Sequence, residues 1–274
     1  MKNVMVLISL IALTSLQAVD NTYRDYETTQ RDCVKELYRL NHTHQTVAFV
    51  HTQEKKYLPL NHAQLGMWEV LERLNALIDD SDPDLDLPQI VHALQTAEAI
   101  RTDGHPDWLI LTGLIHDCGK MLFFFGEPQW AVVGDTFPVG CAFSDKIVHA
   151  DLFENNPDLK NPLYQTKCGI YAPHCGLRNV HMSWGHDEYL YHVVKNYLPE
   201  QAAYIIRYHS FYALHQEKEY MHLLDEYNHE MLKWVKLFNR YDLYSKCPQK
   251  PNAQKLAPYY KDLIARFFPE KLNW

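Results

Sequence analysis

The sequence lacks the features that mark disulfide scaffolds and nucleic-acid-binding proteins. Its six cysteines form no Cys-x-x-Cys pair and suggest no disulfide framework, so a reduced compartment is the easier fit. Lys and Arg number 26 against 34 Asp and Glu, which gives a formal net charge of −8, and no basic cluster interleaved with aromatics occurs. We therefore do not expect nucleic acid as a partner, and a small neutral substrate fits better.

Glycine is also scarce, at 10 of 274 residues, and long helical periodicities fill most of the chain. With 47% hydrophobic residues, the length suffices for one large domain with a sizeable core. We predict an all-α, single-domain helical bundle with a few short strands or long loops. The expected helices are 32–49, 63–78, 88–101, 107–125, 144–153, 186–197, 199–214, 217–245 (with an uncertain break) and 257–268.

Three segments interrupt this helical pattern. Residues 79–88 form an acidic, proline-marked loop, and residues 126–141 form a glycine-rich loop that could hold short strands at 130–133. Residues 155–184 are rich in Asn, Pro and Gly, and loops of that length are usually functional or mobile.

The first 18 residues resemble a signal peptide. Lys2 precedes an apolar run at 4–13 that is too short for an ordinary membrane span, and no membrane span is expected. Ala18 suits a cleavage site, but Leu16 stands where a small residue is expected. We treat residues 1–18 as a possible leader, which leaves secretion open, and residues 19–274 as the domain.

The most informative feature is the dyad His116-Asp117, which lies inside the apolar stretch 107–120. An ionised carboxylate in a buried helix needs a counter-ion, a metal or a proton to compensate its desolvation. A hydrogen-bonded His-Asp pair would satisfy this segment as well as a metal site would. The dyad alone therefore leaves both interpretations open.

Four further residues favour the metal. His92, His186, His209 and Asp242 each fall on the inward face of a predicted helix. Four imidazoles and two carboxylates are more than a core of this size normally buries without a metal. Nitrogen and carboxylate ligands without thiolate suit iron, manganese or zinc. A carboxylate next to a histidine can bridge two cations, so two metals are plausible, although spacing alone does not establish two.

The order His92, His116-Asp117, Asp242 resembles the HD-domain superfamily of helical metalloproteins. Longer strings resemble the myo-inositol oxygenase family, from about Tyr23 to Trp274. They include His-Thr-His-Gln-Thr-Val at 42–47, Leu-Ile-His-Asp-Cys-Gly-Lys at 114–120, the loop at 126–140 and Ser-Trp-Gly-His-Asp-Glu-Tyr at 183–189.

The resemblance implies an oxygenase that cleaves the ring of myo-inositol with O2 to give D-glucuronate and water. Its cofactor would be two iron ions, a mixed-valent Fe(II)/Fe(III) pair. One iron would take His92, His116, Asp117 and Asp242, and the other would take Asp117 as a bridge with His186 and His209. Asp117 and Lys120 would be the catalytic residues. The family also implies a cytoplasmic protein, for which we expect a monomer.

Substrate-binding positions are also implied by the resemblance: Arg24, Asp79, Ser81, Lys120, Gly134, Asp135, His209, Ser210 and Lys246. Many convergent donors and acceptors suit a polyol. Lys120 could instead form only a helical ion pair with Asp117, and Lys246 could do so with Asp242.

Asp187, which follows His186, is expected to be structural or to support a ligand. The remaining histidines, including His181, are expected to be surface or core residues. An HD-type phosphohydrolase is the alternative function, and it predicts clustered Lys and Arg at the metals. A catalytically silent binding protein ranks last, because none of the six ligands is missing.

Overall fold

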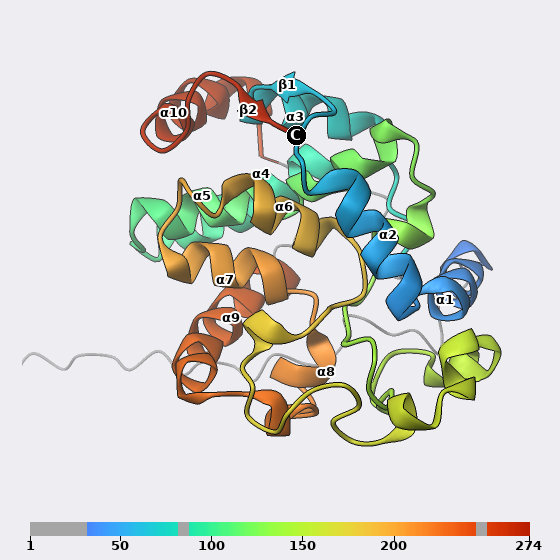
Figure 1. Ribbon diagram of the computed structural model, residues 1–274. Helices are drawn as coiled ribbons and strands as arrows, with labels where there is room; N and C mark the ends of the chain where they lie inside the picture. The colour runs from blue at the N-terminus through green and yellow to red at the C-terminus, as the bar shows by residue number, and fades with distance from the viewer. Residues whose placement is uncertain (1–31, 82–87, 245–250) are drawn as a thin grey trace, which may run out of the picture.

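The computed structural model describes residues 32–81, 88–244 and 251–274, and it is mainly helical, which confirms the predicted class (Figure 1). The α-helices are α1 Asp32–His44, α2 Val47–Tyr57, α3 Met67–Arg73, α4 Gln89–Thr102, α5 Asp107–Ile115, α6 His186–Val194, α7 Glu200–Tyr208, α8 Tyr212–His215, α9 Glu226–Tyr244 and α10 Ala253–Ala265. The 3-10 helices are η1 Leu74–Ala76, η2 Cys118–Phe125, η3 Gln129–Ala131, η4 Ala150–Asn155, η5 Pro157–Lys160, η6 Pro162–Gln165, η7 Leu177–Asn179 and η8 Met221–Leu223. The possible leader at 1–18 lies outside the described residues.

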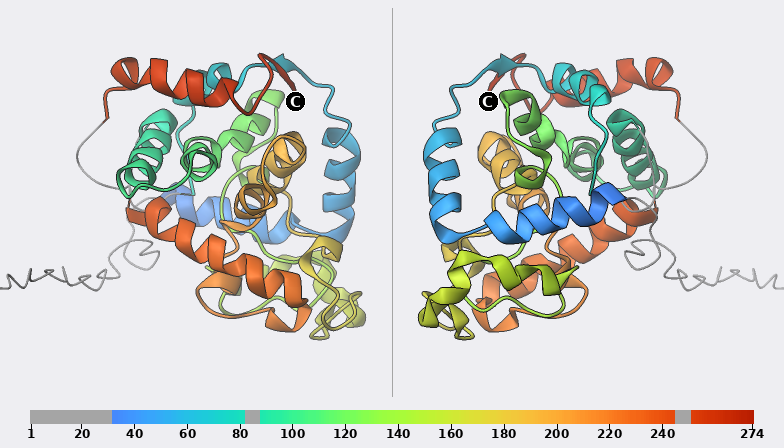
Figure 2. Two further views of the ribbon diagram at one scale, coloured as in Figure 1. Left: turned by 90° about the vertical axis from the view of Figure 1, so that its left-hand side faces the viewer. Right: turned by 90° about the vertical axis from the view of Figure 1, so that its right-hand side faces the viewer.

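The central helices pack against one another and are covered on several sides. Helix α4 packs on α5, α6 packs on α7, and α7 packs on α9. Figures 1 and 2 show α10 and α3 covering α4, α5, α6 and α7 at one end and α9 covering them at the other, with α2 standing along one side. The buried hydrophobic residues form one core cluster. It includes every residue of α5 from Leu109 to Ile115 apart from Thr112, which is polar, and Gly113, which has no side chain.

A two-stranded antiparallel sheet closes the C-terminal end of the chain. Strand β1 (Gln64–Leu65) pairs with β2 (Leu272–Asn273), and the side chain of Trp274 is fully buried. The indole N–H of Trp274 donates to the carbonyl of Leu65 at 3.1 Å. The strands are therefore not at 130–133, as the sequence suggested, where the structure instead has the short helix η3.

Several predicted helices are broken by local capping and turns. The 32–49 helix divides because the Thr46 hydroxyl accepts a hydrogen bond from the backbone N–H of Phe49 and starts α2. The 63–78 helix shortens to α3 and η1 because its first residues join the sheet. The predictions at 144–153 and 217–225 were wrong: turns and the 3-10 helices η4 and η8 occupy them.

The stretch at 107–125 is also divided, into α5 and η2. Among the described residues, this is the one stretch that is long and apolar enough to cross a membrane. Of its most apolar 18-residue segment, 78% is buried inside the protein. That burial is typical of a core helix. At Gly119, a Cβ would lie 2.0 Å from the backbone oxygen of His186, so only glycine allows η2 to approach the start of α6 this closely.

Candidate metal centre

The dyad lies where the chain leaves α5. Helix α5 ends at Ile115, His116 is its C-cap, and Asp117 has φ −93° and ψ 0° before η2 begins. On a continuous helix, adjacent side chains point about 100° apart. Both side chains nevertheless face one centre at this boundary, with His116 Nε2 3.5 Å from Asp117 Oδ2. Both residues are buried.

Two helices bring further ligands to the Oδ2 side of Asp117. His92 on α4 and Asp242 on α9 lie 3.0 Å apart, measured from Nε2 to Oδ1. His116 Nε2 is 3.3 Å from the same Asp242 oxygen and 3.3 Å from His92 Nε2. His92 Nε2 is 3.8 Å from Asp117 Oδ2. We call the four side chains of His92, His116, Asp117 and Asp242 the first half of the centre.

The other oxygen of Asp117 faces a separate pair of histidines. His186 is the first residue of α6, and His209 follows the last residue of α7. Their Nε2 atoms lie 3.3 and 3.7 Å from Asp117 Oδ1. We call Asp117, His186 and His209 the second half of the centre. The structure thus brings together all six residues that the sequence singled out, and Asp117 stands between the two halves.

Backbone carbonyls fix which nitrogen three of the histidines present. The Nδ1 atom of His116 lies 2.9 Å from the carbonyl of Gly113, that of His186 2.9 Å from Val132, and that of His209 3.0 Å from Ile206. A carbonyl only accepts, so each Nδ1 carries a proton, and Nε2 is the nitrogen that each ring turns toward the shared centre. This is the orientation that a metal ligand needs.

Electrostatics at the centre favour cations. Burial opposes ionisation of Asp117, but Lys120 and His116 outweigh it and hold the pKa of that carboxyl well below its usual value. Asp242 is likewise buried, and His116 and His92 hold its pKa well below normal. Burial lowers the pKa of His186, yet Asp187 and Asp117 raise it to about 10. A bound metal ion could take the place of the histidine protons and balance the charge of the same carboxylates.

Asp187 contacts both histidines of the second half, in keeping with the structural or supporting role expected of it. Its side chain is fully buried, and its Oδ1 lies 2.7 Å from His186 Nε2 and 3.5 Å from His209 Nε2. The backbone N–H of Ser210 donates to Asp187 Oδ2 at 3.1 Å, and the Ser210 hydroxyl donates to Oδ1 at 3.2 Å. Asp187 thereby joins the start of α6 to the turn between α7 and α8.

Lys120 links the centre to the acidic loop. Its Nζ lies 2.9 Å from Asp117 Oδ2, 2.7 Å from Asp79 Oδ2 and 3.0 Å from Gln89 Oε1. Asp79 in turn accepts from both the backbone N–H and the hydroxyl of Ser81. The helical ion pair with Asp117 is present, but Lys120 is not limited to it. Gln89 was missed by the sequence analysis, although it precedes His92 by three residues on the same face of α4.

The glycine-rich loop also reaches the second half of the centre. The backbone N–H of Thr136 donates to the carbonyl of Ser210 at 3.0 Å, next to the predicted residues Gly134 and Asp135. Gly134 has φ +99°, a left-handed conformation that favours glycine, and Asp135 accepts a hydrogen bond from Tyr38 at 3.2 Å. Arg24 and Lys246, the other predicted substrate contacts, lie outside the described residues.

Comparison with known proteins decides the family. The myo-inositol oxygenase family model matches residues 31–274. Inositol oxygenase 1 of Arabidopsis thaliana is 56% identical over 92% of this chain and 84% of its own length. Inositol oxygenase of Homo sapiens is 50% identical over 89% of this chain and 87% of its own length. The probable inositol oxygenase of Oryza sativa subsp. japonica is 53% identical over 94% and 86%.

The chain belongs to the myo-inositol oxygenase family. The resemblance inferred from the long strings is thereby confirmed. Two groups of side chains in this family member could each hold a metal ion: His92, His116 and Asp117, and Asp117, His186 and His209. Within each group the ligand atoms lie within 4.8 Å of one another.

Proposed function

We propose that this protein is an inositol oxygenase that cleaves the ring of myo-inositol with O2 and releases D-glucuronate and water. Membership of the family and the names of its relatives support this activity. The observation that carries the proposal is Asp117, whose two carboxylate oxygens face two separate groups of histidines. This arrangement suits a pair of metal ions bridged by one carboxylate.

The residues present fit two iron ions. Histidine nitrogens and carboxylate oxygens without thiolate suit non-haem iron, and three Nε2 atoms already face the centre. His92, His116, Asp117 and Asp242 would hold one ion, while Asp117, His186 and His209 would hold the other. When bound, a mixed-valent iron pair would supply Lewis acidity toward the substrate hydroxyls and a place to activate O2, while the four electrons that reduce O2 come from the inositol itself.

The chain's own residues orient the polyol and control charge around it. Burial opposes the charged form of Lys120, but Asp117 and Asp79 raise its pKa above the usual value, so it stays an ammonium donor. A fixed ammonium can donate to a substrate oxygen that gains negative charge during ring cleavage. Asp79, held by Ser81, accepts hydrogen bonds, and Ser210 and the Gly134–Asp135 loop offer further polar groups.

Such a set of convergent donors and acceptors explains how one polyol could be selected. A substrate that lacks a hydroxyl would leave at least one buried polar group of the site unpaired, which is costly. His116, Asp117, His186 and His209 are buried, so the reacting atoms would be kept largely out of bulk water.

The HD-type phosphohydrolase is not favoured. It would need several Lys or Arg side chains near the metals to bind a phosphate ester. Within the described ranges, Lys120 is the basic side chain that ion pairs place against the centre, and it is shared between Asp117 and Asp79.

The direct test is oxygen uptake by iron-loaded, partly reduced protein supplied with myo-inositol, with glucuronate measured as the product. We expect one glucuronate for each O2 consumed, and loss of both signals in Asp117→Ala. Asp262→Ala, a change at an exposed aspartate on α10, is the matched control and should keep full activity. Two bound irons without glucuronate would refute the proposal, and phosphate esters would then be assayed.

We extend the proposal to a monomer in the cytoplasm, as the family resemblance implies. Light scattering of the purified full chain should give the mass of one chain. A C-terminal tag should place the full-length protein in the cytoplasmic fraction, and recovery in the secreted fraction would instead show that residues 1–18 act as an export signal.

A further inference from the structure

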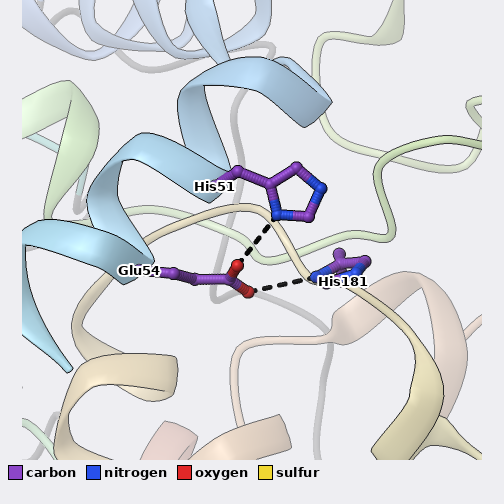
Figure 3. Close-up of side chains that lie close together, drawn as sticks. All are labelled: His51, Glu54 and His181. Carbon is purple, nitrogen blue, oxygen red and sulfur yellow. Dashed lines mark hydrogen bonds and ion pairs between the residues drawn. The ribbon is translucent and has the colours of Figure 1, made fainter.

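A third group of possible metal ligands lies outside the candidate metal centre. His51 and Glu54 are both on α2, and His181 comes from the segment between η7 and α6 (Figure 3). Residues three apart on a helix share a face, so α2 presents the imidazole and the carboxylate side by side. Figure 3 shows the Glu54 carboxylate lying between the two imidazoles. The sequence analysis had assigned His181 only a surface or core role.

Both imidazoles already lie close to the Glu54 carboxylate. His51 Nδ1 lies 3.0 Å from one oxygen of Glu54, and His181 Nδ1 lies 3.1 Å from the other. The two imidazole rings meet edge to face with centroids 4.5 Å apart. Two ligand atoms that each bind an ion at about 2.1 Å stand roughly 3.0–3.4 Å apart for right-angled to tetrahedral geometry. The observed separations match the lower end of this range.

The segment that carries His181 is held in place by its backbone. The backbone N–H of Val139 donates to the carbonyl of His181 at 2.9 Å, and the N–H of His181 donates to the Tyr171 hydroxyl at 3.1 Å. That hydroxyl donates in turn to the carbonyl of Val139 at 2.6 Å. Because the other two ligands sit on a helix, both sides of the group are positioned before any ion arrives, which favours binding.

The group is open to solvent. The side chains of His51, Glu54 and His181 are 49%, 24% and 37% exposed, so an ion can enter directly from water and keep water molecules as its remaining ligands. Two imidazoles and one carboxylate are the donor set of many zinc sites, whereas Mg²⁺ and Ca²⁺ prefer oxygen ligands. The chemistry of the donors therefore selects a borderline transition-metal cation.

We propose that His51, Glu54 and His181 form a surface site for a divalent transition-metal ion, with Zn²⁺ as the best fit. The ion would join α2 to the segment that leads, five residues after His181, into His186 of the metal centre. It would act as a cross-link between two parts of the fold that are distant in sequence, and it would take no part in the reaction.

The test measures zinc bound by the iron-loaded protein. After addition of Zn²⁺ and removal of free ion by gel filtration, elemental analysis should find one zinc per chain with the iron content unchanged. His181→Ala and Glu54→Gln should each lose this zinc while keeping their iron. His229→Ala, a change at an exposed histidine on α9, is the matched control and should bind zinc like the wild type. Mg²⁺ should not be retained.

Two further measurements separate this site from the metal centre. Anomalous diffraction at the zinc edge should place the ion between His51 and His181, and zinc should raise the thermal midpoint of the wild type but not of His181→Ala. Zinc that appears only by displacing iron, or binding that survives both substitutions, would overturn the proposal. Retention of no zinc by a folded, iron-loaded wild type would show a hydrogen-bonded cluster only and would equally refute it.

Discussion

The two halves of the metal centre differ in how many donor groups the protein supplies. The first half offers two imidazoles and two carboxylates, from His92, His116, Asp117 and Asp242. The second half offers two imidazoles and one oxygen of Asp117. Metal sites that hold an ion in place are filled by protein ligands, whereas sites that react keep positions open. The difference suggests that the second half is the one that receives substrate and oxygen.

Their places in the fold agree with this division. The first half is built from the first turn of α4, the end of α5 and the last turn of α9, three helices that pack on one another. The second half uses the first residue of α6 and the residue after α7, where helices meet loops. Val132, Ser210 and Asp187 surround it with loop backbone and polar groups. Loops that border a rigid frame are where substrate contacts are most easily arranged.

The largest expected effect comes from the residue shared by the two halves. Asp117→Ala should reduce iron binding in both halves and lower glucuronate formation by more than about 10²-fold, beyond the range typical of residues that only support a ligand. Asp242→Asn should weaken the first half alone. Iron titrations followed by Mössbauer spectroscopy distinguish the two outcomes. If Asp117→Ala kept one fully occupied iron, the bridging role would be wrong.

Removal of the Lys120 ammonium should give the next largest effect. Lys120→Met deletes a buried donor beside Asp117 and Asp79, and we expect kcat to fall about 10²–10³-fold, as for other donors that stabilise developing charge. Lys120→Arg keeps the charge and should recover part of the rate. The substitution also leaves Asp117 and Asp79 without their cationic partner, which can change how much iron the protein binds. Rates are therefore compared per bound iron pair. An unchanged kcat in Lys120→Met would restrict Lys120 to the ion pair.

Asp187→Asn sharpens the comparison by acting on the second half only. The substitution weakens the attraction for His186 and His209 but leaves the His92 side untouched, so iron affinity should drop about 10–100-fold in the second half alone. Stepwise iron titration should show one unchanged and one weakened phase. Asp151→Asn, a change at an exposed aspartate, controls for loss of charge. Equal weakening of both phases would mean that Asp187 supports the whole fold instead.

Helical spacing pointed to the candidate ligands, but it did not show how they group, which only the family resemblance implied. Helical spacing and the rarity of buried charge sufficed to select His92, His116, Asp117 and Asp242 as inward-facing residues. No periodicity shows that α5 ends at Ile115 or that His116 and Asp117 face one centre at that point. The contact between Asp187 and Ser210 was not predictable either, since the two residues lie 23 apart in sequence.

Breaks in helices were the main error in predicting the fold. Apolar spacing continues across Gln45, Ile115 and Ser210, so the pattern alone predicts longer helices than the structure has. The break at Gln45 follows from the local Thr46 cap, whereas the other two accompany contacts between distant residues: the close approach of Gly119 to His186 and the Asp187–Ser210 hydrogen bonds. Tertiary contacts commonly override local preference in this way.

The smallest expected effect concerns the loop that supports the second half. Glu127, at the start of that loop, is buried and accepts hydrogen bonds from Gln53, Lys56 and Tyr57 on α2 at 2.9, 2.6 and 2.7 Å. Glu127→Gln exchanges the carboxylate for an amide that cannot accept all three. We expect a loss of about 1–3 kcal/mol in the free energy of unfolding and a small change in activity.

The pH dependence tests the same contact. Burial raises the pKa of Glu127, but Lys56 and Tyr57 outweigh it, so the folded-state pKa lies below the ordinary value of 4.5. The stabilisation is therefore complete above about pH 4.5 and is lost as the pH falls below it, because the unfolded chain binds the proton more readily. Urea midpoints measured from neutral to acidic pH should show a shallower acid loss in Glu127→Gln than in the wild type, with Glu230→Gln as the exposed control. Parallel curves would mean that the Glu127 contacts do not hold this loop to α2.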